Sequence, residues 1–374
     1  MPKDSFPDSV IAVDLGGSNL RAALFDGDEI VRYAKTLTPR EGGGPAIYAD
    51  AIIDLIRSNL SAEEIASAKA IGVSVPGPLD MDKGELINSP NLLFPVIPIK
   101  APLEDEFGKP VVVMNDTNCG ILGEVGKDGA GFHNNAGPDN VGHKNIGSNN
   151  VGHKNVGQNN VVYISMSTGI GGGVFADGHL LLGSTGNAGE VGHLFVDDVY
   201  SVRCSCGHTG HWEGYASGRG IPHFFRAYCR KNHIPMKCSA ILPTAEDIFA
   251  GIREELSRSG GNSDGGCDRS CDLGVFAGFY EELSKINARA VSSIIAAYSP
   301  AAIILDGSVA VNNGELIIAG ILRYIDRYLP TPEIRLSRLE GKAPLYGAAY
   351  CCALSLRGYN VHGGNRSAGT HTQY

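Results

Sequence analysis

The sequence predicts an α/β protein, and three observations carry this prediction. Short apolar runs rich in β-branched residues alternate along the chain with longer segments whose apolar residues recur at helical spacing. The chain has 374 residues, which is enough for two domains of ordinary size. Hydrophobic residues make up 43% of the composition, close to the globular norm, so a sizeable core is expected.

The first elements are strands that end in glycine or in polar residues. The apolar run 10–15 predicts a strand that ends in Asp14-Leu15-Gly16-Gly17-Ser18, and a second strand returns after it. Apolar residues at helical spacing predict a helix at 46–60. In chain order, we expect strands at 10–15, 21–25, 71–75 and 110–114, a helix at 46–60, and a helix that follows Asn115-Asp116 through Glu124.

Residues 131–160 differ in composition from the rest of the chain. Residues 140–149 read NVGHKNIGSN, and residues 150–159 repeat this pattern as NVGHKNVGQN. Because such a composition cannot bury a core, we expect a disordered insertion at the surface. Its two histidines, His143 and His153, could bind a metal weakly. The alternative is a loop without function that arose by replication slippage. The sequence indicates no role for the repeat.

The C-terminal part continues the alternation of strands and helices. A strand at 161–165 leads into the glycine-rich segment 167–173, and a strand at 302–305 ends in Asp306-Gly307-Ser308. Residues 358–374 are polar and rich in glycine, which predicts a disordered tail. The expected helices of this part are at 215–231, 244–258, 272–298 and 347–356.

Charge and cysteine content exclude several classes of protein. The net charge is -9 and the pI about 5.7, which argues against a nucleic-acid-binding face and favours a small-molecule function. The first nine residues are polar and do not resemble a signal peptide, and no stretch of about 18 apolar residues predicts a membrane span. Nine cysteines, an odd number, are therefore expected in a reducing cytoplasm as thiols or metal-bound thiolates.

Three glycine-rich turns follow apolar strands, at 14–18, 167–173 and 306–308. Backbone N–H groups at such turns can hold an anion, and glycine lets the backbone approach it closely. Any one of these segments could be an ordinary tight turn. Together they suggest two lobes that hold one polyphosphate, with Asp14 holding Mg²⁺ through water.

Asp116 is the candidate general base, because a carboxylate at the end of a strand could accept a proton from an attacking sugar hydroxyl. The amide of Asn115 could fix the sugar. The alternative for the pair Asn115-Asp116 is an ordinary turn or helix cap.

A cysteine- and histidine-rich segment is the sharpest chemical signal. The ligand types and their spacing suit a closed tetrahedral zinc site formed by His193, Cys204, Cys206 and His211. His208 competes with His211 for the fourth position, and free thiols in a loop are the alternative to a metal site. Glu190 and Glu213 flank this segment and could accept hydrogen bonds from vicinal sugar hydroxyls, or be surface charges.

These motifs resemble the ROK group (repressors, open reading frames, kinases) of the actin-like ATPase superfamily, and within it the ATP-dependent glucokinases and hexokinases. The resemblance extends from about Val10 to Leu356 and is interrupted by the insertion at 131–160. It depends on DLGGSNLR at 14–21, VPGPLD at 75–80, NSPNL at 88–92, MND at 114–116, STGIGGG at 167–173, GNAGEVGH at 186–193 and CSCGHTGHWEGYASG at 204–218.

The resemblance implies a two-lobed actin-like (ribonuclease H-like) α/β fold with the active site in the cleft between the lobes. The implied domains are a small lobe at 1–118, a large lobe at 119–345, a terminal helix at 346–357 that returns to the small lobe, and the tail at 358–374. It also implies a homodimer or homotetramer. From the acidic charge and the lack of a long apolar stretch, we expect no nucleic-acid or membrane partner.

The resemblance also implies roles for individual residues. Asp116 is the general base, and the zinc ligand His193 touches both zinc and the sugar. The implied sugar-binding residues are Asn91, Asn115, Asp116, Glu190, His193 and Glu213, and the implied residues around ATP and Mg²⁺ are Asp14, Gly16, Gly17, Ser18, Thr168, Gly169, Gly307 and Ser308. Two positions depart from the family pattern. His211 replaces a cysteine, which still leaves a sound Cys₂His₂ set like that of some archaeal glucokinases. Asp306 replaces a glycine of the family's adenosine-binding loop, which reads LDGSV at 305–309 here.

The activity implied is phosphorylation of glucose by ATP to glucose 6-phosphate. An N-acetylmannosamine or other amino-sugar kinase is the alternative of the same class. A sugar-sensing transcriptional repressor is disfavoured, because such proteins carry a DNA-binding domain ahead of the first glycine motif and only 13 residues precede Asp14 here. A catalytically silent sugar-binding protein is disfavoured by the presence of Asp14 and Asp116.

Overall fold

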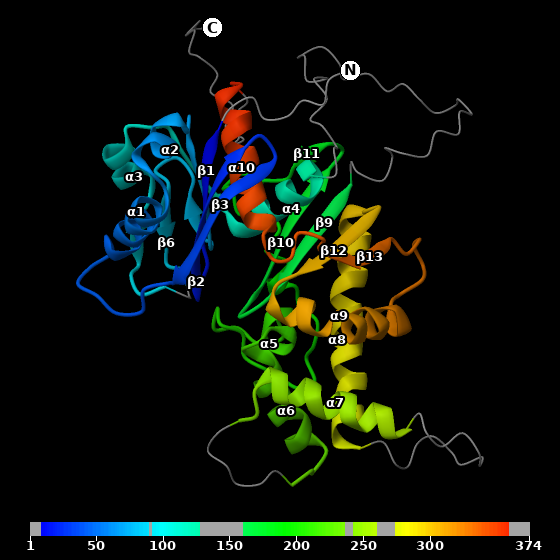
Figure 1. Cartoon of the computed structure of the whole chain (residues 1–374). Coiled ribbons are helices and arrows are strands. Elements are labelled where there is room, and N and C mark those ends of the chain that lie inside the picture. Colours follow the sequence, from blue (N-terminus) through cyan, green and yellow to red (C-terminus); the bar gives the residue numbers. More distant parts are fainter. Residues whose placement is uncertain (1–8, 90–91, 128–159, 236–241, 260–273, 359–374) are drawn as a thin grey trace, which may run out of the picture. The chain divides into compact units, whose positions relative to one another are not determined.

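The computed structural model describes residues 9–89, 92–127, 160–235, 242–259 and 274–358 (Figure 1). The chain divides into two compact units: one comprises residues 1–123, 181–188 and 344–374, and the other comprises residues 124–180 and 189–343. We call these unit 1 and unit 2. Nearly all of the expected insertion at 131–160 and of the expected tail at 358–374 lies outside the described residues, and so does Asn91.

Unit 1 is built on a five-stranded sheet of order β3-β2-β1-β4-β8, in which β1, β4 and β8 are parallel and β2 is antiparallel to both of its neighbours. The strands are β1 Val10–Leu15, β2 Asn19–Asp26, β3 Glu29–Leu37, β4 Ile71–Val75 and β8 Val111–Asn115, with a small second sheet of β5 Leu79–Asp80, β6 Glu85–Ile87 and β7 Val96–Pro98. The helices are α1 Ile47–Asn59, α2 Ala62–Ser67, α3 Lys100–Phe107, the N-terminal part of α4 Asp116–Lys127, and α10 Ala343–Leu356 from Pro344 onward.

The parallel strands of unit 1 bring polar residues to one edge of the sheet. Every residue of β1, β4 and β8 is buried, as expected of strands covered on both faces. The register pairs Asp14 with Ser74, and Val75 with Asn115. Because the carboxyl ends of parallel strands share an edge, the residues that end these three strands are neighbours, although about 100 residues of chain separate the first from the last.

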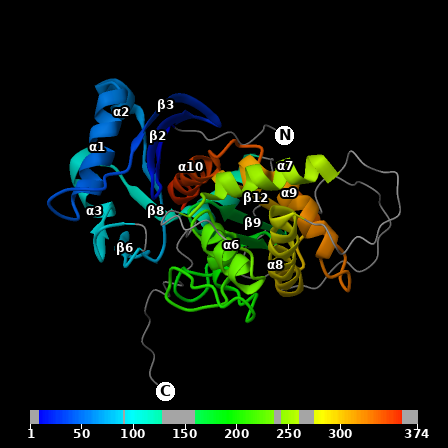
Figure 2. The same cartoon turned by 90° about the horizontal axis from the view of Figure 1, so that it is seen from below.

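Helices cover both faces of this sheet. Both views show α1, α2 and α3 on one side of the sheet and α10 on the other (Figures 1 and 2). A Cβ atom on Gly347 would lie 1.7 Å from the carbonyl oxygen of Cys119, and one on Gly72 would lie 2.1 Å from that of Ala348. Glycine is therefore required at both positions for α10 to approach α4 and β4 this closely.

Unit 2 contains a second five-stranded sheet, of order β11-β10-β9-β12-β13, with β9, β12 and β13 parallel. Its strands are β9 Val161–Met166, β10 Ile170–Ala176, β11 His179–Leu180, β12 Ala302–Asp306 and β13 Glu333–Leu336, and its helices are α5 Trp212–Ala216, α6 Gly220–Lys231, α7 Ala245–Ser259, α8 Val275–Tyr298 and α9 Ser308–Tyr324. Helix α8 packs along α9, and α9 packs on β12. The buried Trp212 donates a 2.8 Å hydrogen bond to Asn287, which ties α5 to α8.

Two expectations from the sequence were wrong in detail. The glycine-rich segment 167–173 is not one turn, because Ile170 begins strand β10 and only 167–169 form the connection. Residues 215–231 are not one helix, because the chain leaves helical geometry at Ser217. The hydroxyl of Ser217 accepts a hydrogen bond from the N–H of Gly220, where α6 begins.

Within the described ranges, no helix combines the length and the apolar character needed to cross a lipid bilayer.

Candidate functional site

In unit 1 the candidate site begins with Asp14 at the carboxyl end of β1. The residue is 6% exposed, and the hydroxyl of Ser74 on β4 donates a 2.9 Å hydrogen bond to the Asp14 Oδ1. The Arg21 guanidinium lies 3.6 Å from Oδ2. Burying a charged carboxylate is tolerated where a hydrogen-bond donor and an opposite charge compensate it, and both are present here.

The glycine turn that follows β1 accepts hydrogen bonds from two residues that lie just after β3. The hydroxyl of Thr38 donates a 2.6 Å hydrogen bond to the carbonyl of Gly16, and the guanidinium of Arg40 donates a 2.7 Å hydrogen bond to the carbonyl of Gly17. Gly17 is half-buried and Ser18 is exposed, so this turn faces solvent next to a cation. Sequence reasoning missed Thr38 and Arg40, since only the antiparallel pairing of β2 with β3 brings them here.

Asn115 and Asp116 lie where β8 ends and α4 begins. The side-chain oxygen of Asn115 accepts hydrogen bonds from the N–H of Thr117 at 2.9 Å, from its hydroxyl at 2.6 Å and from the N–H of Asn118 at 3.3 Å. Asn115 therefore caps the helix, which is one of the alternatives that the sequence left open. Asp116 is the first helical residue, and its half-buried carboxylate accepts a 2.8 Å hydrogen bond from the Thr117 N–H.

Asp14 and Asp116 share an electrostatic neighbourhood. Both carboxylates act on the fully buried thiol of Cys119, one turn into α4. Burial raises the pKa of this thiol well above its usual range, the neighbouring Cys351 adds to the effect, and the charges of Asp14 and Asp116 add further. The charges of both carboxylates, the proposed magnesium ligand and the proposed proton acceptor, thus act on the same buried side chain.

In unit 2 the connection 167–169 meets the start of helix α9. The hydroxyls of Ser167 and Ser308 are 3.2 Å apart, and the N–H of Gly218 donates a 2.7 Å hydrogen bond to the carbonyl of Ser167. The N–H of Arg219 donates to the carbonyl of Thr168 at 3.4 Å. The segments at 167–169 and 306–308, separated by more than 130 residues in sequence, therefore lie side by side.

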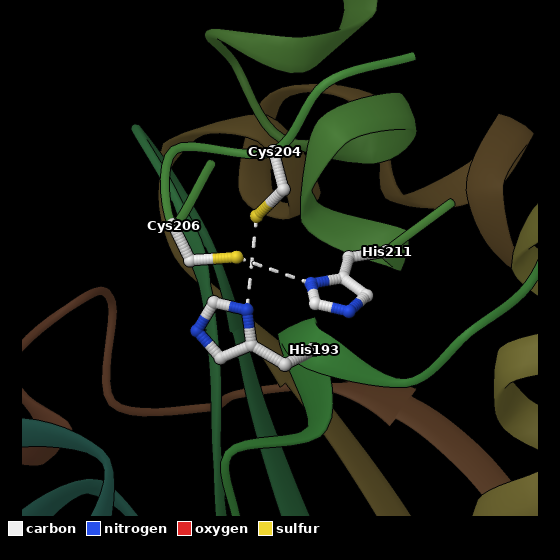
Figure 3. Close-up of side chains that lie close together, drawn as sticks. All are labelled: His193, Cys204, Cys206 and His211. Carbon is white, nitrogen blue, oxygen red and sulfur yellow. Dashed lines mark hydrogen bonds between the residues drawn. The ribbon is translucent and has the colours of Figure 1, made fainter. Parts of the chain in front are cut away.

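Four side chains of the cysteine-rich segment form the group expected from the sequence. In Figure 3 the side chains of His193, Cys204, Cys206 and His211 point toward one another. Their ligand atoms all lie within 4.8 Å of one another, with Cys204 Sγ 3.7 Å from His193 Nδ1 and Cys206 Sγ 3.2 Å from His211 Nδ1. Ligands bound to one tetrahedral zinc ion at 2.0–2.3 Å lie about 3.3–3.8 Å apart, so the donor set fits this ion.

His211 is the histidine closer to Cys206, since its Nδ1 lies 3.2 Å from Cys206 Sγ and that of His208 lies 3.8 Å from it. The N–H of Cys204 donates to the carbonyl of His208, and the N–H of Gly207 donates to the carbonyl of Cys204, which closes a tight turn. His211 is the residue that precedes α5, and the ring of His208 stacks on that of His211 with centroids 5.8 Å apart. Burial and the neighbouring rings of His193 and His208 lower the pKa of His211, which favours the neutral imidazole that binds metals.

Two carboxylates border this group. His193 Nε2 lies 3.9 Å from Glu190 Oε2, so the two nitrogens of this ring face different partners. Glu213 accepts hydrogen bonds from the Ser205 hydroxyl and, at 3.4 Å, from the Cys204 thiol. Loss of water around Glu190 raises the pKa of its carboxyl, the charge of His193 lowers it, and the charge of Glu213 raises it again.

Comparisons with known proteins agree on one family. A sequence profile described as the ROK family matches residues 10–135 and 146–257. The glucokinase of Aeropyrum pernix is 29% identical over 325 residues, which cover 86% of this chain and 88% of that protein.

Solved structures give the same result. The ROK hexokinase of Thermus thermophilus is 26% identical with a TM-score of 0.62, over 94% of this chain and 99% of that one. A ROK-family glucokinase of Streptomyces griseus, solved in complex with glucose and AMPPNP, is 24% identical with a TM-score of 0.59, over 91% of this chain and 98% of that one. The α/β class and the actin-like fold expected from the sequence are thereby confirmed.

Proposed function

Because the chain belongs to the ROK family, we propose that it is an ATP-dependent hexose kinase that converts glucose to glucose 6-phosphate. The observation that carries this proposal is the placement of Asp116, a half-buried carboxylate at the first position of α4, on the same sheet edge as Asp14. A kinase of this kind needs one carboxylate for the proton of the attacking hydroxyl and another for the metal that accompanies ATP.

The sugar is bound by amide and carboxylate side chains. Asp116 accepts the proton of the C6 hydroxyl as that oxygen attacks the γ-phosphorus. The bond from the γ-phosphorus to the β–γ bridging oxygen breaks at the same time, and ADP leaves. Position 116 suits a base for two reasons. The half-buried carboxylate is accessible to a substrate, and the hydrogen bond that it accepts from the Thr117 N–H fixes its orientation. The sugar-binding residues that we propose are Asn91, Asn115, Asp116, Glu190, His193 and Glu213.

The nucleotide is bound by backbone N–H groups at the glycine-rich segments 14–18, 167–169 and 306–308. Asp14 would hold Mg²⁺, which supplies charge neutralisation at the transferred phosphoryl group. The proposed residues around the nucleotide are Asp14, Gly16, Gly17, Ser18, Thr168, Gly169, Gly307 and Ser308.

A structural zinc ion completes the proposal. His193, Cys204, Cys206 and His211 would hold it, and its chemistry is to order a loop that is too polar to fold by burial alone. His193 would bind the ion through Nδ1, which faces Cys204, and leave Nε2 for a sugar hydroxyl beside Glu190. We place the reaction in the cytoplasm and expect a homodimer or homotetramer.

A coupled assay of ADP formation tests the proposal. The purified protein is incubated with ATP, Mg²⁺ and, separately, glucose, mannose, N-acetylglucosamine and N-acetylmannosamine. We expect the highest kcat/KM with glucose. A higher kcat/KM with an amino sugar would replace glucose as the substrate, and the absence of ADP formation with every sugar would contradict the kinase proposal.

A further inference from the structure

Asp306, the residue that departs from the family's glycine pattern, lies at the end of β12 with its carboxylate buried. It is 1% exposed, and each of its carboxylate oxygens accepts one hydrogen bond. The hydroxyl of Tyr163, on the neighbouring parallel strand β9, donates to Oδ2 at 2.8 Å, and the N–H of Gly307 donates to Oδ1 at 2.7 Å. Tyr163 is itself 2% exposed, so the interaction lies in the interior of unit 2.

The residue after Asp306 has little conformational choice. Gly307 has a φ of +88°, and a Cβ atom on it would lie 2.5 Å from the carbonyl oxygen of Met166. Only glycine fits, and the chain passes directly over the end of β9. Helix α9 begins at the next residue, Ser308, whose hydroxyl lies 3.2 Å from that of Ser167.

A continuous set of contacts therefore links the core to the nucleotide segment. Tyr163 fixes the Asp306 carboxylate, this carboxylate fixes the N–H of Gly307, and the position of Gly307 sets where Ser308 lies relative to Ser167. A glycine residue has no flexible side chain to anchor it, so its position depends on its backbone contacts. A carboxylate that is itself held on both oxygens is a rigid acceptor for the Gly307 N–H, because neither oxygen can rotate away without losing a buried hydrogen bond.

We propose that Asp306 is a positioning residue for the nucleotide: anchored by Tyr163, it holds the Gly307–Ser308 segment in the conformation that binds ATP. This proposal rests on the proposed function, since it takes Gly307 and Ser308 as nucleotide-binding residues. It assigns a role to the one position of the adenosine loop where this chain departs from the pattern, and it gives the buried Tyr163 hydroxyl a part in nucleotide affinity.

The test compares Tyr163→Phe, Asp306→Asn and Asp306→Gly with the wild-type protein. In Asp306→Asn the amide can accept from Gly307 and donate to the Tyr163 hydroxyl, so both contacts remain. Tyr280→Phe is the matched control, because it removes another hydroxyl of unit 2 that donates a 2.8 Å hydrogen bond, in this case to the carbonyl of Leu316 between helices α8 and α9.

We expect Tyr163→Phe and Asp306→Gly to raise the KM for ATP about tenfold, which corresponds to about 1.4 kcal/mol, while the KM for glucose changes less than about twofold. Asp306→Asn should stay close to the wild-type KM for ATP, and so should Tyr280→Phe. The dissociation constant of a fluorescent ATP analogue, measured at equilibrium without sugar, should follow the same order.

Melting temperatures of all variants separate a positioning role from a structural one. If Tyr163→Phe lowers the melting temperature but leaves the KM and the dissociation constant for nucleotide unchanged, the proposal is overturned. An equal rise in KM for ATP and for glucose also overturns it. If the wild-type protein binds the ATP analogue but phosphorylates no sugar, the proposed function fails, and the binding constants of the variants still decide the role of Asp306.

Discussion

The N–H of Ile170, the first residue of β10, donates a 3.1 Å hydrogen bond to Glu213 Oε2 in helix α5. The other oxygen of the same carboxylate accepts a hydrogen bond from Ser205, which lies between Cys204 and Cys206 of the proposed zinc loop. One half-buried side chain therefore joins the proposed zinc loop to the first residue of β10, which directly follows the connection 167–169 where we place the phosphates. Glu213 thus links the proposed zinc loop to the segment of unit 2 that we propose binds the nucleotide.

Removal of this link is expected to affect both substrates. Glu213→Ala deletes the acceptor for Ile170 and Ser205, so we expect kcat/KM for glucose to fall at least about 100-fold and the KM for ATP to rise as well. Steady-state kinetics with each substrate varied in turn measure both effects. Glu282→Gln is the control, since Glu282 accepts hydrogen bonds from Tyr200 and Lys285 at the surface of unit 2. A normal KM for ATP in Glu213→Ala would contradict the link.

Metal analysis tests the zinc site. We expect about one zinc per chain in the purified protein, and none in Cys206→Ala, because loss of one thiolate leaves three ligands at a site that should be closed by four. The variant should also melt at a lower temperature, since zinc binding contributes to the stability of the loop. Cys229→Ala, which removes a buried thiol of helix α6, should retain its zinc. Wild-type protein that is folded and free of metal would refute the site.

Stability should fall at alkaline pH because of buried thiols in unit 1. Burial raises the pKa of Cys119 and of Cys352 well above 9.0, so the folded protein keeps protons that the unfolded chain releases. The unfolded state then binds fewer protons, and the free energy of unfolding decreases as pH rises through about 9 and beyond. Each such thiol contributes up to about 1.4 kcal/mol per pH unit.

Urea denaturation between pH 8 and pH 10.5, in the presence of a reductant, measures this slope. Cys352→Ala removes one of the two thiols, so its free energy of unfolding should fall less steeply with pH than that of the wild-type protein. Identical slopes in the two proteins would show that Cys352 ionises with an ordinary pKa.

The sequence predicted the central strands well because they are uniformly apolar. Strands β1, β4 and β8 lie within a residue or two of the expected ranges. Because both faces of these strands are buried, their sequences are continuous runs of apolar residues, which a helix at the protein surface does not show. Strand β3 was missed, because it is an exposed edge strand without alternation. Helix α9 was missed too: its dihedral angles depart from helical values at Asn313, where asparagines interrupt the apolar pattern.

The sequence allowed candidate site residues to be proposed, but not the contacts that those residues make. The cysteines and histidines of the zinc group are close in sequence, so their spacing alone indicates a site. Contacts such as Ser74 to Asp14, Arg40 to Gly17 or Tyr163 to Asp306 join different strands or loops. These contacts depend on the register of neighbouring strands and on the path of the loops between them, and neither produces a recognisable pattern in the sequence.

The role of Asp116 is the central claim, and one variant tests it most directly. Asp116→Asn keeps the size of the side chain and an acceptor for the Thr117 N–H but removes the base. We expect its kcat to fall about 10²- to 10⁴-fold while the dissociation constant for glucose, measured by calorimetry, changes little. Asp105→Asn, at an exposed position of α3, should behave as wild type. A kcat within about threefold of wild type in Asp116→Asn would contradict the account.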